Sequence, residues 1–247
     1  MSKNSSLSEE VRAVILGSLL GDGSLRLHKK YQNARFFIRH SSKQKEYFLW
    51  KVSLLREISG EKCWIEQSPD GWSNNTKLLY QSKALPEITE LYKLTHSGQN
   101  LRVRRKWLNL MTPLSLAIMW MDDGSIIGNG RRGVICTDRI PYDEQLIICK
   151  YLSKVWGVKA RVGMKSRGSA ACRIWIRSAE SLKRLLRIIL PYVKVESMLP
   201  KVLLIYRDAH AQKRWASEVA SATGFPEETV WRYIEEKKLR WRSQMKI

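Results

Sequence analysis

Two apolar runs predict the helices around which the chain is organised. The first run covers residues 15–20 and ends in Gly21-Asp22-Gly23, and the second covers residues 116–121 and ends in Asp122-Asp123-Gly124. A serine followed by two acids, at residues 8–10, predicts the start of the first helix. A Thr-Pro pair at residues 112–113 predicts the start of the second.

Small residues form a stripe along the first predicted helix. Ala13, Gly17 and Gly21 recur every four residues, so they share one face. A glycine inside a helix costs about 1 kcal/mol relative to alanine. Two glycines on one stripe therefore predict that another backbone packs very close, and we expect it to be the second helix.

After each predicted helix the same order of elements follows: two strands, a helix, two strands and a helix. This repeat predicts an α+β fold built from a duplicated αββαββα unit, with a first half at residues 1–110, a second half at residues 111–204 and a helical C-terminal extension at residues 205–247. The expected elements after the helices are residues 24–28, 34–40, 42–58, 63–67, 76–82 and 85–94, and residues 125–127, 133–137, 142–156, 160–164, 172–177 and 179–190.

The net charge of the chain indicates which class of molecule it binds. Lys and Arg number 44 against 23 Asp and Glu, a formal net charge of +21 on 247 residues. A protein this basic usually faces a polyanion, most often nucleic acid. A membrane surface is disfavoured because no apolar run is long enough to span a bilayer and the basic residues are spread along the chain.

The spacing of the cysteines and the composition of the first ten residues indicate the cellular compartment of the protein. The four cysteines are isolated, without Cys-x-x-Cys or Cys/His ligand spacing, which predicts a reducing compartment and no structural zinc. Residues 1–10 are polar and predict neither a secretion signal nor an Arg-rich transit peptide. We expect a protein of the cytoplasm, or of an organelle matrix if it is organelle-encoded.

The two acids that close the apolar runs are candidate metal ligands. Asp22 and Asp123 fall at helix C-termini, where a carboxylate is disfavoured by about 0.3–1 kcal/mol. A divalent cation removes this cost, and the carboxylates with the carbonyls of Gly21 and Asp122 would make hard-oxygen ligands suited to Mg²⁺. Paired acids beside a basic surface predict metal-assisted phosphodiester hydrolysis. The alternative is two core helices that simply end in Asp-Gly.

Both acidic stretches resemble the LAGLIDADG motif of homing endonucleases, and the resemblance covers about residues 8–205. It implies a monomer in which two pseudo-twofold halves form a saddle of two four-stranded sheets over double-stranded DNA. It also implies that Asp22 and Asp123 are the metal-binding catalytic acids, one for each strand cut across the minor groove. Mg²⁺ is the expected ion, and Mn²⁺ or Ca²⁺ would substitute for it in binding. Intron encoding is expected because residues 112–124 resemble the second motif of intron-encoded members, and the lack of flanking splice-domain sequence argues against an intein.

Basic residues near the cleaved phosphates are expected from the same resemblance. Residues 197–202 resemble a Ser-Met-Leu-Tyr-Lys-Leu stretch of the family, so Lys201 matches its lysine, although Pro200 replaces the tyrosine. The corresponding place in the first half has Arg102 as its best match. Arginine stabilises negative charge but is a poor proton carrier, so the two strand cuts are expected to be unequal.

Alternation along the predicted strands gives candidate DNA contacts, since basic side chains on a sheet face reach phosphates and base edges. Packing within the sheet is the alternative for the two aromatic members. The candidates are Arg35, Phe37, Arg39, Lys77, Gln81, Lys83, Arg161, Lys165, Arg173, Trp175 and Arg177.

The C-terminal extension resembles a helix-turn-helix over residues 216–234. Gly224 would make the turn, and the expected core is Val219, Phe225, Val230 and Tyr233. The helix at residues 226–238 would then lie in a major groove. The alternative is a helical hairpin packed on the second half. The expected DNA contacts of this segment are Arg232, Lys237 and Lys238.

Together these features predict a Mg²⁺-dependent, site-specific double-strand DNA endonuclease. Two alternatives stay open. One is an RNA maturase that assists the splicing of its own intron. The other is a DNA-binding regulator with a degenerate nuclease body.

Overall fold

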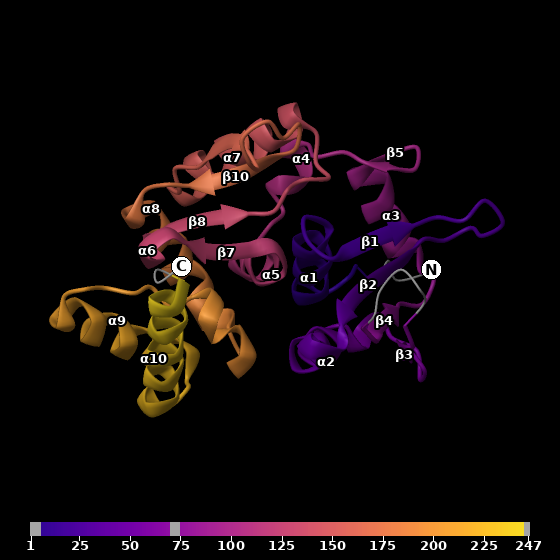
Figure 1. Cartoon of the computed structure of the whole chain (residues 1–247). Helices are drawn as coiled ribbons and strands as arrows, with labels where there is room; N and C mark the ends of the chain where they lie inside the picture. The colour runs from indigo at the N-terminus through magenta and orange to yellow at the C-terminus, as the bar shows by residue number, and fades with distance from the viewer. Residues whose placement is uncertain (1–5, 70–74, 245–247) are drawn as a thin grey trace. The chain divides into compact units, whose positions relative to one another are not determined.

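The computed structural model describes residues 6–69 and 75–244 (Figure 1). The chain forms two compact units, Met1–Asp122 and Asp123–Ile247. Each unit contains one four-stranded antiparallel sheet with helices around it.

In the first unit the sheet has the strand order β1-β2-β4-β3. Helix α1 precedes the sheet, α2 and α3 connect or follow its strands, and α5 ends the unit. The bounds are α1 (Glu9–Leu19), β1 (Gly23–Arg26), β2 (Arg35–Ser41), η1 (Ser42–Gln44), α2 (Lys45–Leu54), η2 (Arg56–Ile58), β3 (Trp64–Gln67), β4 (Lys77–Gln81), α3 (Pro86–Thr95), β5 (His96–Ser97), β6 (Asn100–Leu101), α4 (Arg105–Leu108) and α5 (Pro113–Asp123).

The second unit repeats this order, and its sheet is arranged β7-β8-β10-β9. Two further helices follow the repeat. The bounds are β7 (Gly124–Ile127), α6 (Gly128–Arg131), β8 (Arg132–Ile135), α7 (Tyr142–Trp156), β9 (Arg161–Met164), β10 (Cys172–Ile176), α8 (Ala179–Ile189), η3 (Leu190–Tyr192), η4 (Glu196–Lys201), α9 (Ala209–Thr223) and α10 (Glu227–Gln244).

The equivalent strand orders confirm the predicted duplicated α+β fold with C-terminal helices. The compact units divide inside α5, after Asp122, whereas the sequence places that whole helix in the second half.

Glycine lets α1 approach α5, as the small-residue stripe predicts. A Cβ added at Gly17 would lie 2.5 Å from the Ser115 carbonyl oxygen and 2.9 Å from Ile118 Cβ. A Cβ added at Gly21 would meet the Asp122 side chain, with 2.6 Å to Oδ2. The absence of side chains at these two positions therefore brings the end of α5 against the turn that carries Asp22.

The two faces of the first sheet differ as the alternation predicts. On β2, Phe36, Ile38 and His40 are buried, while Arg35 and Phe37 are half-buried and Arg39 is exposed on the other face. The same alternation holds on β10 of the second sheet, where Ile174 and Ile176 are buried and the intervening residues are not. Each sheet therefore keeps one open face.

The C-terminal extension consists of α9 and α10, joined by a short turn in which Gly224 has a φ of +85°. Val219 and Val230 of the expected core are buried, and Ile234 is buried with them. Phe225 and Tyr233 are only half-buried. Within this unit α10 packs on η4, where Lys237 donates to the carbonyls of Pro200 and Leu203.

Within the described parts of the chain, we find no helix that combines the length and the apolar character required to cross a membrane.

Candidate active site

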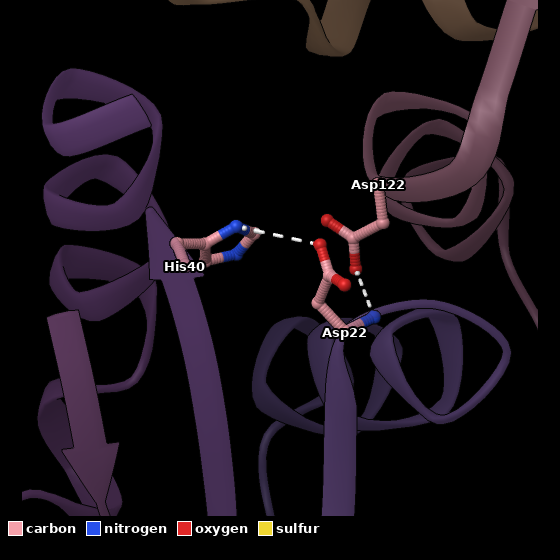
Figure 2. Close-up of side chains that lie close together, drawn as sticks. All are labelled: Asp22, His40 and Asp122. Carbon is pink, nitrogen blue, oxygen red and sulfur yellow. Dashed lines mark hydrogen bonds and ion pairs between the residues drawn. The ribbon is translucent and has the colours of Figure 1, made fainter. Parts of the chain in front are cut away.

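Asp22 lies in the turn between α1 and β1 at the edge of the first sheet. Its side chain is 39% exposed. The backbone N–H of Asp22 donates to Asp122 Oδ2 at 3.1 Å, and the Asp22 carbonyl accepts from the Arg39 N–H at 3.4 Å. Figure 2 shows Asp22 between His40 on β2 and Asp122 at the end of α5. The acid is therefore fixed at its backbone while its carboxylate reaches solvent.

Asp122 is a buried carboxylate with several donors. Its side chain is 0% exposed and pairs with the equally buried Lys51 ammonium at 2.9 Å. The Tyr47 hydroxyl donates to Oδ1 at 2.8 Å. Burial alone would raise the pKa of Asp122, but the charge of Lys51, the neighbouring His40 and the hydrogen bonds from Lys51 and Tyr47 outweigh burial and lower that pKa below the ordinary value. Asp122 is therefore held as an anion.

His40, on β2 of the first sheet, is the third member of the cluster with Asp22 and Asp122. Its ring lies 3.4 Å from Asp22 Oδ2 through Nδ1, and the same nitrogen lies 3.1 Å from Gln44 Oε1. Its Nε2 lies 3.4 Å from the Lys51 ammonium. The His40 side chain is 0% exposed, so these polar partners stand in place of water.

A basic groove begins at Asp22 and extends over the open face of the first sheet. Its walls come from β1, β2, β3 and β4 and from the segments that follow η2 and β4. Its polar lining residues include Asp22, Ser24, Arg26, Arg35, Arg39, Lys62, Tyr80, Gln81, Ser82 and Lys83. A phosphate-bearing ligand in this groove would lie beside the Asp22 carboxylate.

The second unit gathers a smaller set of groups around its own acid. The Asp123 carbonyl accepts from the Cys136 N–H at 2.9 Å, the counterpart of the Asp22–Arg39 bond. Burial raises the pKa of the Cys136 thiol, and the charges of Arg173, Asp123 and Lys201 also act on it. The segment η4, which ends at Lys201, contacts β7, the strand that directly follows Asp123.

Comparison with known proteins agrees with this geometry. A family model described as the LAGLIDADG DNA endonuclease family matches residues 12–183. The chain belongs to this family. The expected resemblance is thereby confirmed over most of the duplicated part.

Three individual relatives are similar to this chain at identities between 23% and 29%. The chain is 29% identical over 214 residues to Protein RecA of Mycobacterium shimoidei, covering 81% of this chain and 48% of that one. It thus spans about half the length of the curated relatives it matches first. It is 23% identical over 199 residues to DNA endonuclease I-ChuI of Chlamydomonas applanata, 71% of this chain and 87% of that one. It is 26% identical over 207 residues to the cytochrome b mRNA maturase bI2 of Saccharomyces cerevisiae, a match that covers 76% of this chain and 46% of that one.

Among solved structures, the homing endonuclease I-WcaI bound to its DNA recognition sequence superposes with a TM-score of 0.71. The match covers 82% of this chain and 89% of that one at 17% identity. At this identity the likeness shows the fold alone, and it agrees with the duplicated LAGLIDADG fold described above.

The structure places the predicted DNA contacts on the open faces of the two sheets. On β4, Gln81 pairs with Phe37 and Lys77 pairs with Ser41, so both share the face of Arg39. On the second sheet, Arg173, Trp175 and Arg177 share a face with Arg161 and Lys165. Their roles in binding stay predictions.

Several of these groups already have partners within the chain. Asp138 pairs with Arg173 at 2.6 Å and with Lys165 at 3.1 Å. The hydrogen bond from Arg173 is the largest cause that lowers the Asp138 pKa to about 2. The Trp175 indole donates to the Gly163 carbonyl at 3.1 Å, a contact that favours packing for this aromatic residue.

The tail residues are engaged in the same way. Arg232 pairs with Glu196 of η4, and Lys238 pairs with Glu235 at 2.7 Å. Lys237 is largely buried, and burial lowers its pKa to about 8. These contacts join α10 to the segment that ends in Lys201, and a DNA-binding role for the three residues stays a prediction.

Arg102 is exposed after β6 and does not line the groove beside Asp22. Its carbonyl accepts from the Trp107 indole at 2.8 Å, which fixes the backbone there. The basic side chains that do line the groove with Asp22 come from the sheet strands and their ends. The catalytic role of Arg102 stays a prediction.

A divalent cation fits Asp22 better than Asp122. Candidate ligand atoms of Asp22, His40 and Asp122 lie within 4.8 Å of one another. The Asp122 carboxylate, however, already binds the Lys51 ammonium, which would repel a cation. The exposed side of the Asp22 carboxylate with carbonyl oxygens is the donor set that Mg²⁺ prefers. The predicted carbonyl ligands at Gly21 and Asp122 stay predictions.

Sequence reasoning missed Lys51, Tyr47 and His40 as functional residues. A signal for Lys51 exists: it occupies the apolar face of α2, four residues after Tyr47 and four before Leu55, both buried. A lysine at a core position needs a buried partner. His40 gives the same signal, since it shares the core face of β2 with Phe36 and Ile38.

Proposed function

We propose that this chain cuts both strands of DNA at a specific long site by metal-assisted phosphodiester hydrolysis, with Asp22 and Asp123 as the catalytic acids and Mg²⁺ as the ion. The observation that carries the proposal is the Asp22 carboxylate, solvent-accessible and backbone-anchored, at the end of a basic groove. Family membership gives the reaction class.

The residues divide the work by their position. Arg39 and Arg35 lie along the groove and would bind the DNA backbone on the first half of the site. Asp22, with neighbouring carbonyl oxygens, would hold the cation against the cleaved phosphate. When bound, the cation polarises the phosphate and lowers the pKa of a water molecule, which is the chemistry that a carboxylate alone lacks.

In the second unit, Asp123 and Lys201 would serve the other strand. Lys201 ends η4, which contacts the strand that follows Asp123, and a lysine there can stabilise developing negative charge or transfer a proton. We place no lysine in the equivalent role beside Asp22, and we therefore propose that the two strands are cut at unequal rates.

A selection experiment tests this function. Purified protein is incubated with a library of randomised DNA duplexes and Mg²⁺, and cut molecules are amplified and sequenced. The proposal predicts enrichment of one long site and loss of cutting with EDTA. Failure to enrich any cut sequence with Mg²⁺ or Mn²⁺ would refute it.

An RNA maturase is the second candidate function, because one relative is a cytochrome b mRNA maturase. The same basic groove would bind either nucleic acid. Competition between the selected duplex and the transcript that flanks the gene separates the two. Tighter binding of the RNA, with no cutting of the duplex, favours the maturase. A duplex bound without metal-dependent nicking favours the regulator.

A further inference from the structure

The ammonium of Lys51 is fully satisfied although its side chain is completely buried. It donates to Asp122 Oδ1 at 3.0 Å and to Oδ2 at 2.9 Å, and it contacts His40 Nε2 at 3.4 Å. Three acceptors match the three N–H bonds of an ammonium. A buried charge with this geometry is expensive to place and is therefore a specific feature of the site.

Through Asp122, Lys51 fixes the backbone of Asp22. The Lys51 ammonium and the Tyr47 hydroxyl hold the Asp122 carboxylate in place. Its Oδ2 then accepts the Asp22 N–H at 3.1 Å. Gly21 has no side chain that could block this approach. A charge-assisted bond of this kind is stronger than one between neutral groups.

Through His40, Lys51 also fixes the side chain of Asp22. An ammonium only donates, so His40 Nε2 must accept and cannot carry the proton. The proton is then on Nδ1, which faces Gln44 Oε1 at 3.1 Å and Asp22 Oδ2 at 3.4 Å. The ring therefore presents an N–H to the Asp22 carboxylate and has no free lone pair for a metal ion.

At the position equivalent to His40 the second unit has a different residue with a different partner. Gly23 pairs with Ile38 in the first sheet, and Gly124 pairs with Ile135 in the second. Two residues further along the chain from each of these positions, His40 of β2 corresponds to Thr137, which lies just beyond the end of β8. The Thr137 hydroxyl donates to Gln145 instead.

We propose that Lys51 is the positioning residue of the first catalytic centre: it holds Asp122 and sets the tautomer of His40, and together these orient the Asp22 carboxylate toward its cation. The proposal rests on the function proposed above, in which Asp22 is a catalytic acid. It adds a device to the first centre that uses His40, where the second unit has Thr137 at the equivalent position.

The first test measures the tautomer and needs no activity. Long-range ¹H–¹⁵N correlation spectra of the full chain distinguish a ring with Nδ1–H from one with Nε2–H. His40 is identified among the four histidines by substituting the other three one at a time. We expect His40 to carry its proton on Nδ1. A wild-type ring with the proton on Nε2 would overturn the proposal.

The second test separates positioning from folding. In the double variant Lys51→Met/Asp122→Asn both buried charges are removed together, and the amide oxygen can still accept the Asp22 N–H. We expect thermal stability near wild type, but cutting of the Asp22-dependent strand about 10- to 100-fold slower. The cut of the other strand is the internal reference, because unfolded molecules cut neither strand. An unchanged ratio of the two cuts would show that the pair serves folding alone.

A milder pair of variants covers the case in which the double variant does not fold. Tyr47 and Tyr92 both lie in the first unit, and each phenol donates a hydrogen bond, to Asp122 at 2.8 Å and to the Gly98 carbonyl at 2.6 Å. Tyr47→Phe should slow the cut of the Asp22-dependent strand relative to the cut of the other strand, and Tyr92→Phe should leave this ratio unchanged. An equal ratio of the two strand cuts in the two variants would contradict the proposal. A wild-type protein that cuts no duplex refutes the proposed function instead, and the tautomer measurement still decides the Lys51 network.

Discussion

Replacing Gly17 by alanine should destabilise the first unit, although alanine favours a helix. The added Cβ would lie 2.5 Å from the Ser115 carbonyl oxygen and 2.9 Å from Ile118 Cβ, whereas ordinary contacts begin at 3.4 Å. A backbone oxygen cannot rotate away as a side chain can. Because the interior is closely packed and leaves no free space, α1 and α5 must separate by about 1 Å to restore an ordinary contact.

The magnitude follows from two opposing effects. Overpacking of a core costs about 1–3 kcal/mol, and a clash with backbone belongs to the upper end of that range. The change from glycine to alanine inside a helix returns about 1 kcal/mol. The net loss in the free energy of unfolding should therefore be about 2 kcal/mol.

Urea unfolding followed by circular dichroism and tryptophan fluorescence measures this loss. Gly60→Ala is the matched control, because a Cβ there would meet nothing within 4 Å. That change should be neutral or stabilise by up to about 1 kcal/mol. A Gly17→Ala protein as stable as the wild type would refute the close packing of α1 on α5.

Three further predictions concern charge. Arg39→Ala should weaken duplex binding and reduce the slope of log K against log salt by about 1, as measured by fluorescence anisotropy at several salt concentrations; an unchanged slope would remove Arg39 from the groove's phosphate contacts. Because the pKa of Asp138 is lowered to about 2, its pairing stabilises the fold above pH 4 and is lost as the pH falls toward 2. In acid titrations Asp138→Asn should therefore be less stable than wild type at pH 6 and indistinguishable near pH 2, and a difference that persists there would contradict this. Burial lowers the pKa of Lys237 to about 8, so the unfolded chain binds more protons between pH 8 and 10.5 and stability should rise with pH in that window. In Lys237→Met the free energy of unfolding should rise by up to about 3 kcal/mol less than in the wild type across this window, as measured by urea unfolding at each pH. Parallel pH profiles of the variant and the wild type would contradict this prediction.

Much of the fold could be predicted because local patterns and tertiary packing agree. The helix at residues 142–156 and the strand at residues 161–164 are where alternation and turn residues place them. The glycine stripe predicts the α1–α5 contact correctly at Gly17, which lies inside α1, whereas Gly21 lies in the turn after that helix and not within it as the sequence predicts. The short hairpin of β5 and β6 has too few residues to give a periodic signal.

The active site was predictable only in part. Asp22 and Asp123 stand out because each closes an apolar run before a glycine. The Lys51–Asp122 pair joins residues 71 positions apart, and no local pattern shows such a contact. Asp122 could be assigned only a carbonyl role from sequence, because its carboxylate gains its partners from α2 through folding.

The proposed cutting of DNA depends most directly on the two acids, Asp22 and Asp123. Single-turnover cutting of the selected duplex by Asp22→Asn and Asp123→Asn, with duplex affinity measured in parallel, tests them together. We predict that each variant loses at least about 100-fold in double-strand cutting, the scale expected when a charge-stabilising group is removed, and keeps its affinity within about threefold. Undiminished double-strand cutting by either variant would contradict the assignment.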